Sequence, residues 1–164
     1  MPSRAVLFAI TEEDLAALLE RDRSPALVDY MIEVIEDRWD SDNLCELDKA
    51  WDAIHRCLTD GSLDPDAGEY PLNAAVFGRE GLHAGTNYFV GLTRAADVSI
   101  VAEAVSQIDS DWIRRAYSTK VPTDYAPEYG ETDREYTAGW FEALADFWRT
   151  AATRGRSVIF TVDQ

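Results

Sequence analysis

Asp48, Asp52 and His55 are the residues of this sequence whose types and spacing best suit chemistry. They are separated by four and three positions, so on a helix both carboxylates and the imidazole would lie along one stripe. A carboxylate beside an imidazole raises the pKa of the ring and orients it, as a general base requires. The same pattern also fits a partly buried structural histidine flanked by solvated acids. We favour this second interpretation, because structural ion pairs are commoner than catalytic ones.

A pocket for a small molecule is the alternative use of the same segment. Trp51 lies one helical turn before His55, and the second histidine, His83, lies in a glycine-rich stretch that precedes Tyr88. Trp51, His55, His83 and Tyr88 would then line a pocket in which His55 acts as the base and Asp48 or Asp52 orients it. This alternative corresponds to a small-ligand-binding protein or a hydrolytic enzyme.

The sequence lacks the other motifs that would support an enzyme. It has two histidines and no cysteine pair at ligand spacing, which argues against a zinc site. The glycine-rich stretch 78–81 lacks the Lys-Ser/Thr pair that grips phosphates, and no serine lies in a Gly-x-Ser-x-Gly elbow. We therefore predict no metal and no cofactor, and the residues favour a protein that is not an enzyme.

The strongest property of the whole chain is its negative charge. Its 164 residues carry 31 acids and 15 bases, a formal net charge of −16. Such a surface repels phosphate backbones and anionic lipids, so nucleic acid and membranes are disfavoured as partners, and a basic protein is the natural complement. The acids are dense between residues 33 and 52, where the candidate partner surface comprises Glu33, Glu36, Asp37 and Asp40. A purely solubilising face explains these acids equally well.

Targeting and cysteine patterns favour a cytoplasmic protein. The apolar run at residues 5–10 is too short for a signal peptide, and no stretch of about 18 apolar residues is present. Cys45 and Cys57 are expected in one helix, where twelve positions correspond to about 18 Å between their α-carbons. That distance exceeds the roughly 7 Å that a disulfide tolerates, so we predict two reduced thiols.

The elements that must position these residues follow from hydrophobic spacing and from capping residues. Strands are predicted at 4–10, 87–92 and 157–162. Thr11 is expected to cap the first helix, Pro25 to open the second, and Asp42 or Asn43 to cap a third that runs to about residue 58. Further helices are predicted at 71–77, 94–108, 112–117 and 132–154. The last of these has a capping box of Thr132 with Glu135 and a stop at Gly155.

These elements sum to a helix-rich α+β protein, a single domain over residues 1–164 with a small sheet of about three strands. The order of the strands cannot be derived from the pattern.

Three blocks of residues resemble the YfbM-like bacterial family, a domain of unknown function. They are Asp48-Lys49-Ala50-Trp51-x-x-Ile54-His55-x-x-Leu58-Thr59, Pro71-Leu72-x-x-Ala75-Val76-x-Gly78 and Gly91-Leu92-Thr93. The likeness extends to the closing helix and strand and covers nearly the whole chain. The chain departs from the family pattern at Thr59-Asp60-Gly61 and at Tyr125-Ala126-Pro127. The resemblance implies a small α+β cytoplasmic bacterial protein, and it implies no established activity.

The leading hypothesis is a non-catalytic protein-binding module, of the immunity or inhibitor type, that captures a basic partner. It depends on the excess of acids, the small size and the absence of a complete catalytic set. The alternative is the small-ligand-binding or hydrolytic protein with a pocket centred on His55. The pattern does not predict an oligomeric state.

Overall fold

The computed structural model describes residues 3–126 and 130–163, and its centre is an antiparallel sheet. The five strands follow the order β2-β1-β5-β4-β3 across the sheet, so the first and last strands of the chain lie side by side in its middle. β2 and β3 form the two edges. The strands are β1 (Ala5–Ile10), β2 (Leu44–Asp48), β3 (Glu80–Ala84), β4 (Tyr88–Thr93) and β5 (Ser157–Asp163).

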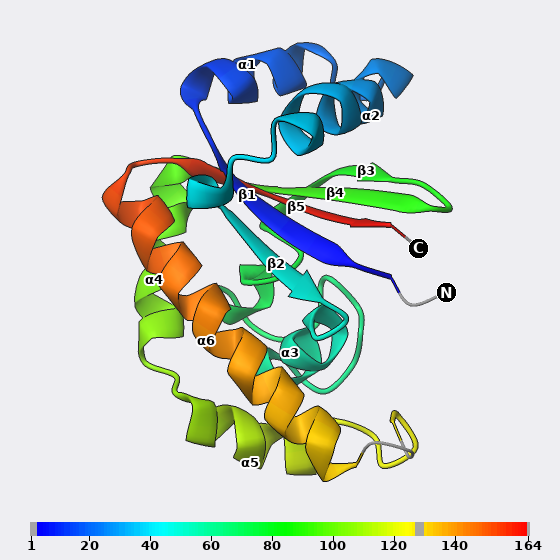
Figure 1. Ribbon diagram of the computed structural model, residues 1–164, viewed down its shortest axis with the longest axis vertical. Coiled ribbons are helices and arrows are strands. Elements are labelled where there is room, and N and C mark those ends of the chain that lie inside the picture. The colour runs from blue at the N-terminus through cyan, green and yellow to red at the C-terminus, as the bar shows by residue number, and fades with distance from the viewer. Residues whose placement is uncertain (1–2, 127–129, 164) are drawn as a thin grey trace.

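Helices cover both faces of this sheet and create three layers (Figure 1). One face carries α1 (Glu12–Glu20), α2 (Pro25–Tyr30) and the π-helical turn η1 (Met31–Glu36). The other carries α3 (Trp51–Leu58), α4 (Ala95–Ser106), α5 (Ser110–Lys120) and α6 (Glu131–Thr153). Two short 3₁₀ turns, η2 (Ser41–Asn43) and η3 (Leu72–Ala74), complete the description. No helix within the described residues is long and apolar enough to cross a lipid bilayer.

Two hydrophobic cores result from the alternation of side chains along the strands. In β1, Leu7 points to the core under α3–α6, and its neighbour Phe8 points to the core under α1 and α2. In β5, Phe160 and Ile159 divide in the same way. Because these strands are buried on both faces, they consist of nearly unbroken apolar runs, which made them recognisable in the sequence.

The predicted α+β class is confirmed, but the sheet is larger than expected. The predicted strands at 4–10, 87–92 and 157–162 correspond to β1, β4 and β5, while β2 and β3 were missed. β3 is a partly exposed edge strand that contains Gly81, so its sequence resembles a turn.

The prediction of one helix from Asp42 or Asn43 to Leu58 is wrong. Its first half is η2 and the strand β2, and α3 begins only at Trp51. Asp48 has a φ of 47°, a left-handed conformation that a right-handed helix cannot continue. Leu44 and Leu47 have helical spacing to Trp51, but pairing with β1 determines their conformation. Cys45 and Cys57 therefore lie on separate elements, and both are free and buried.

The predicted helix ends are partly confirmed. The Thr11 hydroxyl accepts a hydrogen bond from the Asp14 amide, as a cap requires. Gly155 has a φ of 63°, and the amides that follow α6 bond back to Ala152 and Ala151 in the Schellman pattern. The predicted capping box at Thr132 is wrong, because α6 begins at Glu131 with no side-chain cap.

A buried carboxylate holds the α1–α2 layer together. Asp14 is 5% exposed, and both of its oxygens accept hydrogen bonds from the Arg38 guanidinium, at 2.9 and 3.1 Å. The Tyr30 hydroxyl donates to the same carboxylate at 3.1 Å. Burial alone would raise the pKa of Asp14, but the bonds and charge of Arg38 outweigh burial and lower it. The short helices α1 and α2 are thereby fixed to the end of η1.

Candidate functional site

His55 lies in the protein interior, where its ring is fully buried. Its Nε2 lies 2.8 Å from the backbone carbonyl of Asp64, and a carbonyl can only accept, so Nε2 carries the proton. The ring packs edge-on against Phe77 with 4.6 Å between centroids. Nδ1 is also buried and has no hydrogen-bond partner among the described residues. The imidazole thus anchors the loop after α3 to the core and has no lone pair open to a substrate.

The two aspartates do not join His55 in a catalytic stripe. Asp52 accepts a hydrogen bond of 2.6 Å from Arg56 Nε, one turn later on α3. Asp48 lies before α3, at the end of β2, where it accepts from the Tyr136 hydroxyl at 2.6 Å. Arg4 lies 3.5 Å from the same carboxylate. The predicted stripe of Asp48, Asp52 and His55 is therefore not formed, because the chain turns at Asp48 and the Asp52 carboxylate bonds to Arg56.

We expect His55→Gln to lower the free energy of unfolding by about 1–3 kcal/mol near pH 7, because it leaves buried polar partners unpaired and loses the contact with Phe77. Burial lowers the pKa of His55 below its ordinary 6.5, although the Asp64 carbonyl and Asp52 oppose this. The unfolded chain therefore binds the proton more readily. The contribution of neutral His55 is complete above about pH 6.5 and is lost as the pH falls toward the folded-state pKa.

Urea melts of the parent and His55→Gln at several pH values between about 7 and 5 measure this contribution. The parent is expected to lose more stability over that range than the variant does. Equal losses in both proteins would contradict the burial of an uncharged imidazole.

The predicted pocket of Trp51, His55, His83 and Tyr88 is not assembled. Trp51 and His55 belong to the α3 face of the sheet, whereas Tyr88 packs on the opposite face. There the Tyr88 hydroxyl donates to Glu36, and burial followed by this bond raises the pKa of Tyr88. His83 lies half-buried on the edge strand β3, opposite Val90. The sheet itself separates the two pairs of residues.

Three of the four residues of the predicted acidic surface are exposed, and the fourth, Glu36, is not. Glu33, Asp37 and Asp40 are exposed on η1 and the chain after it. Glu36 is half-buried and accepts from Tyr88 and from the Thr161 hydroxyl, the latter at 3.2 Å. Glu36 therefore attaches η1 to the sheet and is not free to meet a partner.

A hollow lies at the open edge of β2, and we call it the edge groove. It measures about 530 Å³ and lies between the segment Trp39–Glu46 and the helix α6. Arg154, just after α6, donates to the Asp42 carbonyl at 2.9 Å and to Asn43 Oδ1 at 2.6 Å, which holds the two walls together. The lining residues are Ala9, Trp39, residues 41–46 and an α6 stripe of Trp140, Ala143, Asp146, Phe147, Thr150 and Ala151.

The walls of the edge groove combine an exposed aromatic ring with carboxylates. Trp39 is 43% exposed, although its ring makes an edge contact with the buried Phe8 at 6.0 Å. Asp42, Glu46 and Asp146 line the hollow, and no lysine or arginine does. Within the described residues, the side chains of Asp42 and Glu46 form no ion pair, and Asp146 pairs with the exposed Arg149 at 2.9 Å. The groove is therefore an anionic surface with an aromatic anchor.

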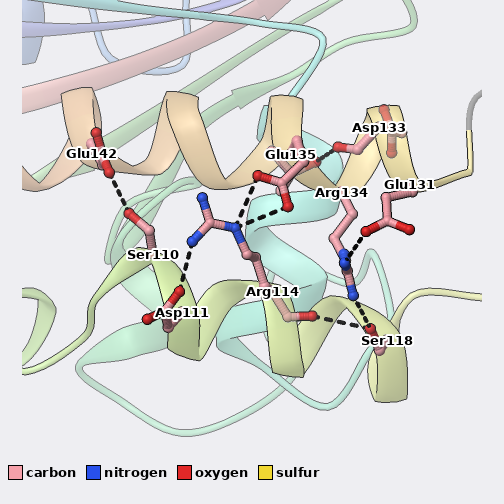
Figure 2. A network of polar contacts seen from close by, with 10 residues as sticks. Ser110, Asp111, Arg114, Ser118, Glu131, Asp133, Arg134, Glu135 and Glu142 are labelled. Atoms are coloured by element: carbon pink, nitrogen blue, oxygen red, sulfur yellow. Dashed lines mark hydrogen bonds and ion pairs between the residues drawn. The ribbon is translucent and has the colours of Figure 1, made fainter.

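A second hollow, between α5 and α6, is lined by Arg114 and Arg134, which already have partners, and by the exposed Arg115, which forms no ion pair among the described residues. Arg114 Nε donates to both oxygens of Glu135 at 3.0 Å, and its Nη1 donates to Asp111 at 2.7 Å (Figure 2). Arg134 bonds Glu131 on its own helix and Ser118 on α5. The Arg114–Glu135 pair and the Arg134–Ser118 bond join the two helices, as Figure 2 shows, and the acidic partners neutralise two of the three cations of this hollow.

The sequence analysis did not identify the edge groove. Trp39 carried the one local signal, because it lies among Asp37, Arg38 and Asp40, without the apolar neighbours expected around a buried tryptophan. Asp146 carried none, since its proximity to Asp42 depends on the packing of α6 along β2. Among the described residues, no group of three or more His, Cys, Asp or Glu side chains is arranged to hold a metal ion.

Comparisons with known proteins agree with this fold and with the resemblance seen in the sequence. A family model described as a domain of unknown function, DUF1877, matches residues 1–161. The chain is 29% identical to protein YfbM of Escherichia coli K12 over 111 residues, which is 68% of this chain and 64% of YfbM. A crystal structure of E. coli YfbM, titled a protein of unknown function, superposes with a TM-score of 0.69 at 20% identity. That superposition covers 98% of this chain and 99% of the other.

Proposed function

This chain belongs to the DUF1877 family of domains of unknown function, and we propose that it is a non-catalytic protein-binding module. In this proposal the edge groove captures a basic segment of a partner protein, as an immunity protein or inhibitor captures its target. The observation that carries the proposal is the combination, in one hollow, of the exposed Trp39 with Asp42, Glu46 and Asp146.

Electrostatics supports a basic partner. The three acids of the groove are part of a chain whose formal net charge is −16. A concave surface lined by one sign of charge concentrates the field and speeds the encounter with an oppositely charged protein. The exposed Glu33, Asp37 and Asp40 precede the groove wall in the chain and extend the same negative region.

Trp39 supplies binding energy that the charges alone do not. Exposed rim charges contribute little affinity, whereas tryptophan is enriched among the residues that dominate interface energies. The face of an indole also binds a guanidinium through a cation–π contact. Trp39, beside three carboxylates, therefore suits an arginine side chain better than a lysine.

The surroundings of His55 favour this proposal over a hydrolase. A general base must reach the proton that it removes, and the proton on Nε2 is already directed to a backbone carbonyl. Asp48 and Asp52, the candidate orienting groups, bond to Tyr136 and Arg56. The binding role requires none of these residues and uses surface that the fold leaves open.

Binding of a fluorescent arginine-rich peptide at low salt tests the proposal. We expect the triple variant Asp42→Asn, Glu46→Gln, Asp146→Asn to bind the peptide about tenfold more weakly than the parent. Trp39→Ala is expected to lose a similar factor, as an aromatic anchor does.

The matched control removes three acids that lie outside the groove, in the triple variant Glu20→Gln, Asp29→Asn, Asp66→Asn. It changes the net charge equally, so it is expected to bind within about twofold of the parent when the groove is the site. Equal weakening by the two triple variants would mean diffuse attraction to the whole surface. That result would overturn the proposed site.

A further inference from the structure

The floor of the edge groove is an unpaired edge of the sheet. β2 pairs with β1 on one side only, and Leu44, Cys45 and Glu46 of this strand line the groove. A smaller hollow of about 210 Å³ also borders β2 and shares Glu46 and Trp140 with the edge groove. Hollows therefore border β2 from Leu44 to Glu46 and again at Asp48, and the second of them is also lined by Arg4.

The direction of each backbone group follows from two hydrogen bonds at the far edge of the sheet. The carbonyl of Tyr88 accepts from the Gly85 amide at 3.0 Å, and that of Leu92 accepts from the Arg79 amide at 3.0 Å. Both donors lie at the β3 side of β4, so even-numbered residues of β4 direct their backbone groups toward β3. The direction of the backbone groups alternates from one residue to the next, so those of Gly91 point toward β5.

The same alternation can be followed across the sheet to β2. Gly91 is opposite Phe160, so the backbone N–H and C=O groups of Phe160 point toward β4 and not toward β1. Leu7 is opposite Phe160, so the backbone groups of Leu7 must point toward β2. The backbone groups of its partner on β2, Cys45, therefore point toward β1. The neighbours of Cys45 have the opposite orientation. The N–H and C=O groups of Leu44 and Glu46 consequently point away from β1, toward the groove.

We infer that the basic segment binds as a sixth, extended strand paired with β2. This inference rests on the proposed function and specifies the conformation of the partner segment. An added strand would use the outward backbone groups of Leu44 and Glu46, as in other cases of strand addition. Of these groups, the Glu46 carbonyl also accepts a bond from Cys45 Sγ at 3.6 Å. Its side chains would alternate between the α6 wall, with Asp146, and the opposite wall, with Trp39 and Asp42.

Charge argues against a second copy of this chain as the occupant. Pairing of β2 with β2 would bring two copies of Glu46 and of the neighbouring Asp42 together, on molecules that each have a formal net charge of −16. Like charges directly opposite one another destabilise a strand pair. A strand with arginine at every second position instead places all of its cations beside one wall and its other side chains beside the opposite wall.

Amide hydrogen exchange gives a direct readout of pairing. The probe is a short peptide of alternating arginine and valine with blocked ends. Leu44 and Glu46 amides are expected to exchange quickly in the free protein and at least tenfold more slowly in the complex. Cys45 is an internal control, because its amide already faces β1 and its exchange should change little.

A variant of the protein tests the hydrogen bond between the Glu46 amide and the peptide independently. Glu46→Pro removes the outward N–H, and an edge strand tolerates proline where the N–H faces away from the sheet. It is compared with Glu46→Gln, which removes the same charge and keeps the donor. We expect Glu46→Pro to bind the peptide about tenfold more weakly than Glu46→Gln, while equilibrium sedimentation shows both free variants as monomers.

Peptides with modified backbones provide the test if Glu46→Pro does not fold. N-methyl groups are placed on the valine nitrogens of one peptide and on the arginine nitrogens of another. At least one of them should bind the parent protein about tenfold more weakly than the unmodified peptide does.

The outcomes separate this inference from the proposed function. Tight binding of both methylated peptides, with no protection of Leu44 or Glu46, would overturn strand addition and leave the groove as a site for a basic segment in another conformation. No groove-dependent binding of the unmodified peptide would overturn both. A parent protein that forms dimers through β2 would also contradict the inference, because the edge would then be covered by a second copy.

Discussion

Replacing Trp51 with alanine is expected to lower the free energy of unfolding by about 3–5 kcal/mol, the range for loss of a large buried aromatic side chain. Trp51 opens α3 and is 6% exposed. Its ring makes an edge contact with Phe77 at 5.7 Å and a tilted one with Phe160 at 6.2 Å. Its indole N–H donates to the Ser3 carbonyl at 3.2 Å, so the variant would lose packing and a hydrogen bond together.

The matched control is Trp39→Ala, which removes the same side chain from an exposed position. Trp39 is 43% exposed and contacts the core through Phe8. We expect this variant to lose about 1 kcal/mol or less, since surface substitutions are usually mild. Guanidinium melts of the parent and both variants provide the measurement. If Trp51→Ala unfolded at the same guanidinium concentration as the parent, the Trp51 side chain would not be part of the core.

Replacing Gly91 with alanine is expected to cost about 3 kcal/mol or more, at or beyond the upper end of the range for overpacked cores. Gly91 lies in β4, opposite Phe160 on β5 and Gly81 on β3. A Cβ built on Gly91 would lie 1.7 Å from the carbonyl oxygen of Phe77. Because that oxygen belongs to the backbone, rotation of a side chain cannot relieve the overlap.

The damage would spread because Phe77 connects several parts of the core. Its ring contacts those of Trp51, His55, Phe89 and Phe160, with centroid distances between 4.6 and 5.7 Å. Displacement of the segment after η3 therefore disturbs the packing of α3 on the sheet. Thermal and denaturant melts of Gly91→Ala are expected to show either a large loss of stability or no cooperative transition.

Gly139→Ala is the control with the opposite expected sign. Gly139 is exposed within α6, and a Cβ there meets no atom of the described structure within 4 Å. Alanine is a better helix former than glycine, so this variant should gain roughly 0.5–1 kcal/mol. Equal effects of the two substitutions would contradict the close approach of the Phe77 carbonyl oxygen to Gly91.

Elements with strong local signals could be predicted from the sequence. β1, β4 and β5 are apolar runs, since both of their faces are buried, and such runs are visible without knowledge of their neighbours. Thr11 and Gly155 mark helix ends because capping depends on residues within one turn. The edge strand β2 could not be predicted, because its pairing partner β1 is distant in the chain. The edge strand β3 pairs with the adjacent β4, but it contains Gly81 and is partly exposed, so its sequence resembles a turn. In β2 a chance helical spacing of leucines gave the opposite indication.

The candidate site was less predictable than the fold for the same reason. The sequence indicated an acidic protein with a basic partner, and it singled out Trp51 and His55 as central residues. It could not show that Asp48 ends a strand, or that the sheet lies between Trp51 and Tyr88.

Composition and local pattern by themselves determined the charge of this protein, its α+β class, its family resemblance and some of its helix ends. Each of these depends on residue type or on spacing within a few turns. Only the tertiary structure decided that His55 is sequestered against Phe77 and the Asp64 carbonyl, and that Trp39 and Asp146 line one hollow at an open strand edge. These arrangements join residues that are distant in the chain, and strand pairing and core burial, which act between distant segments, bring them together.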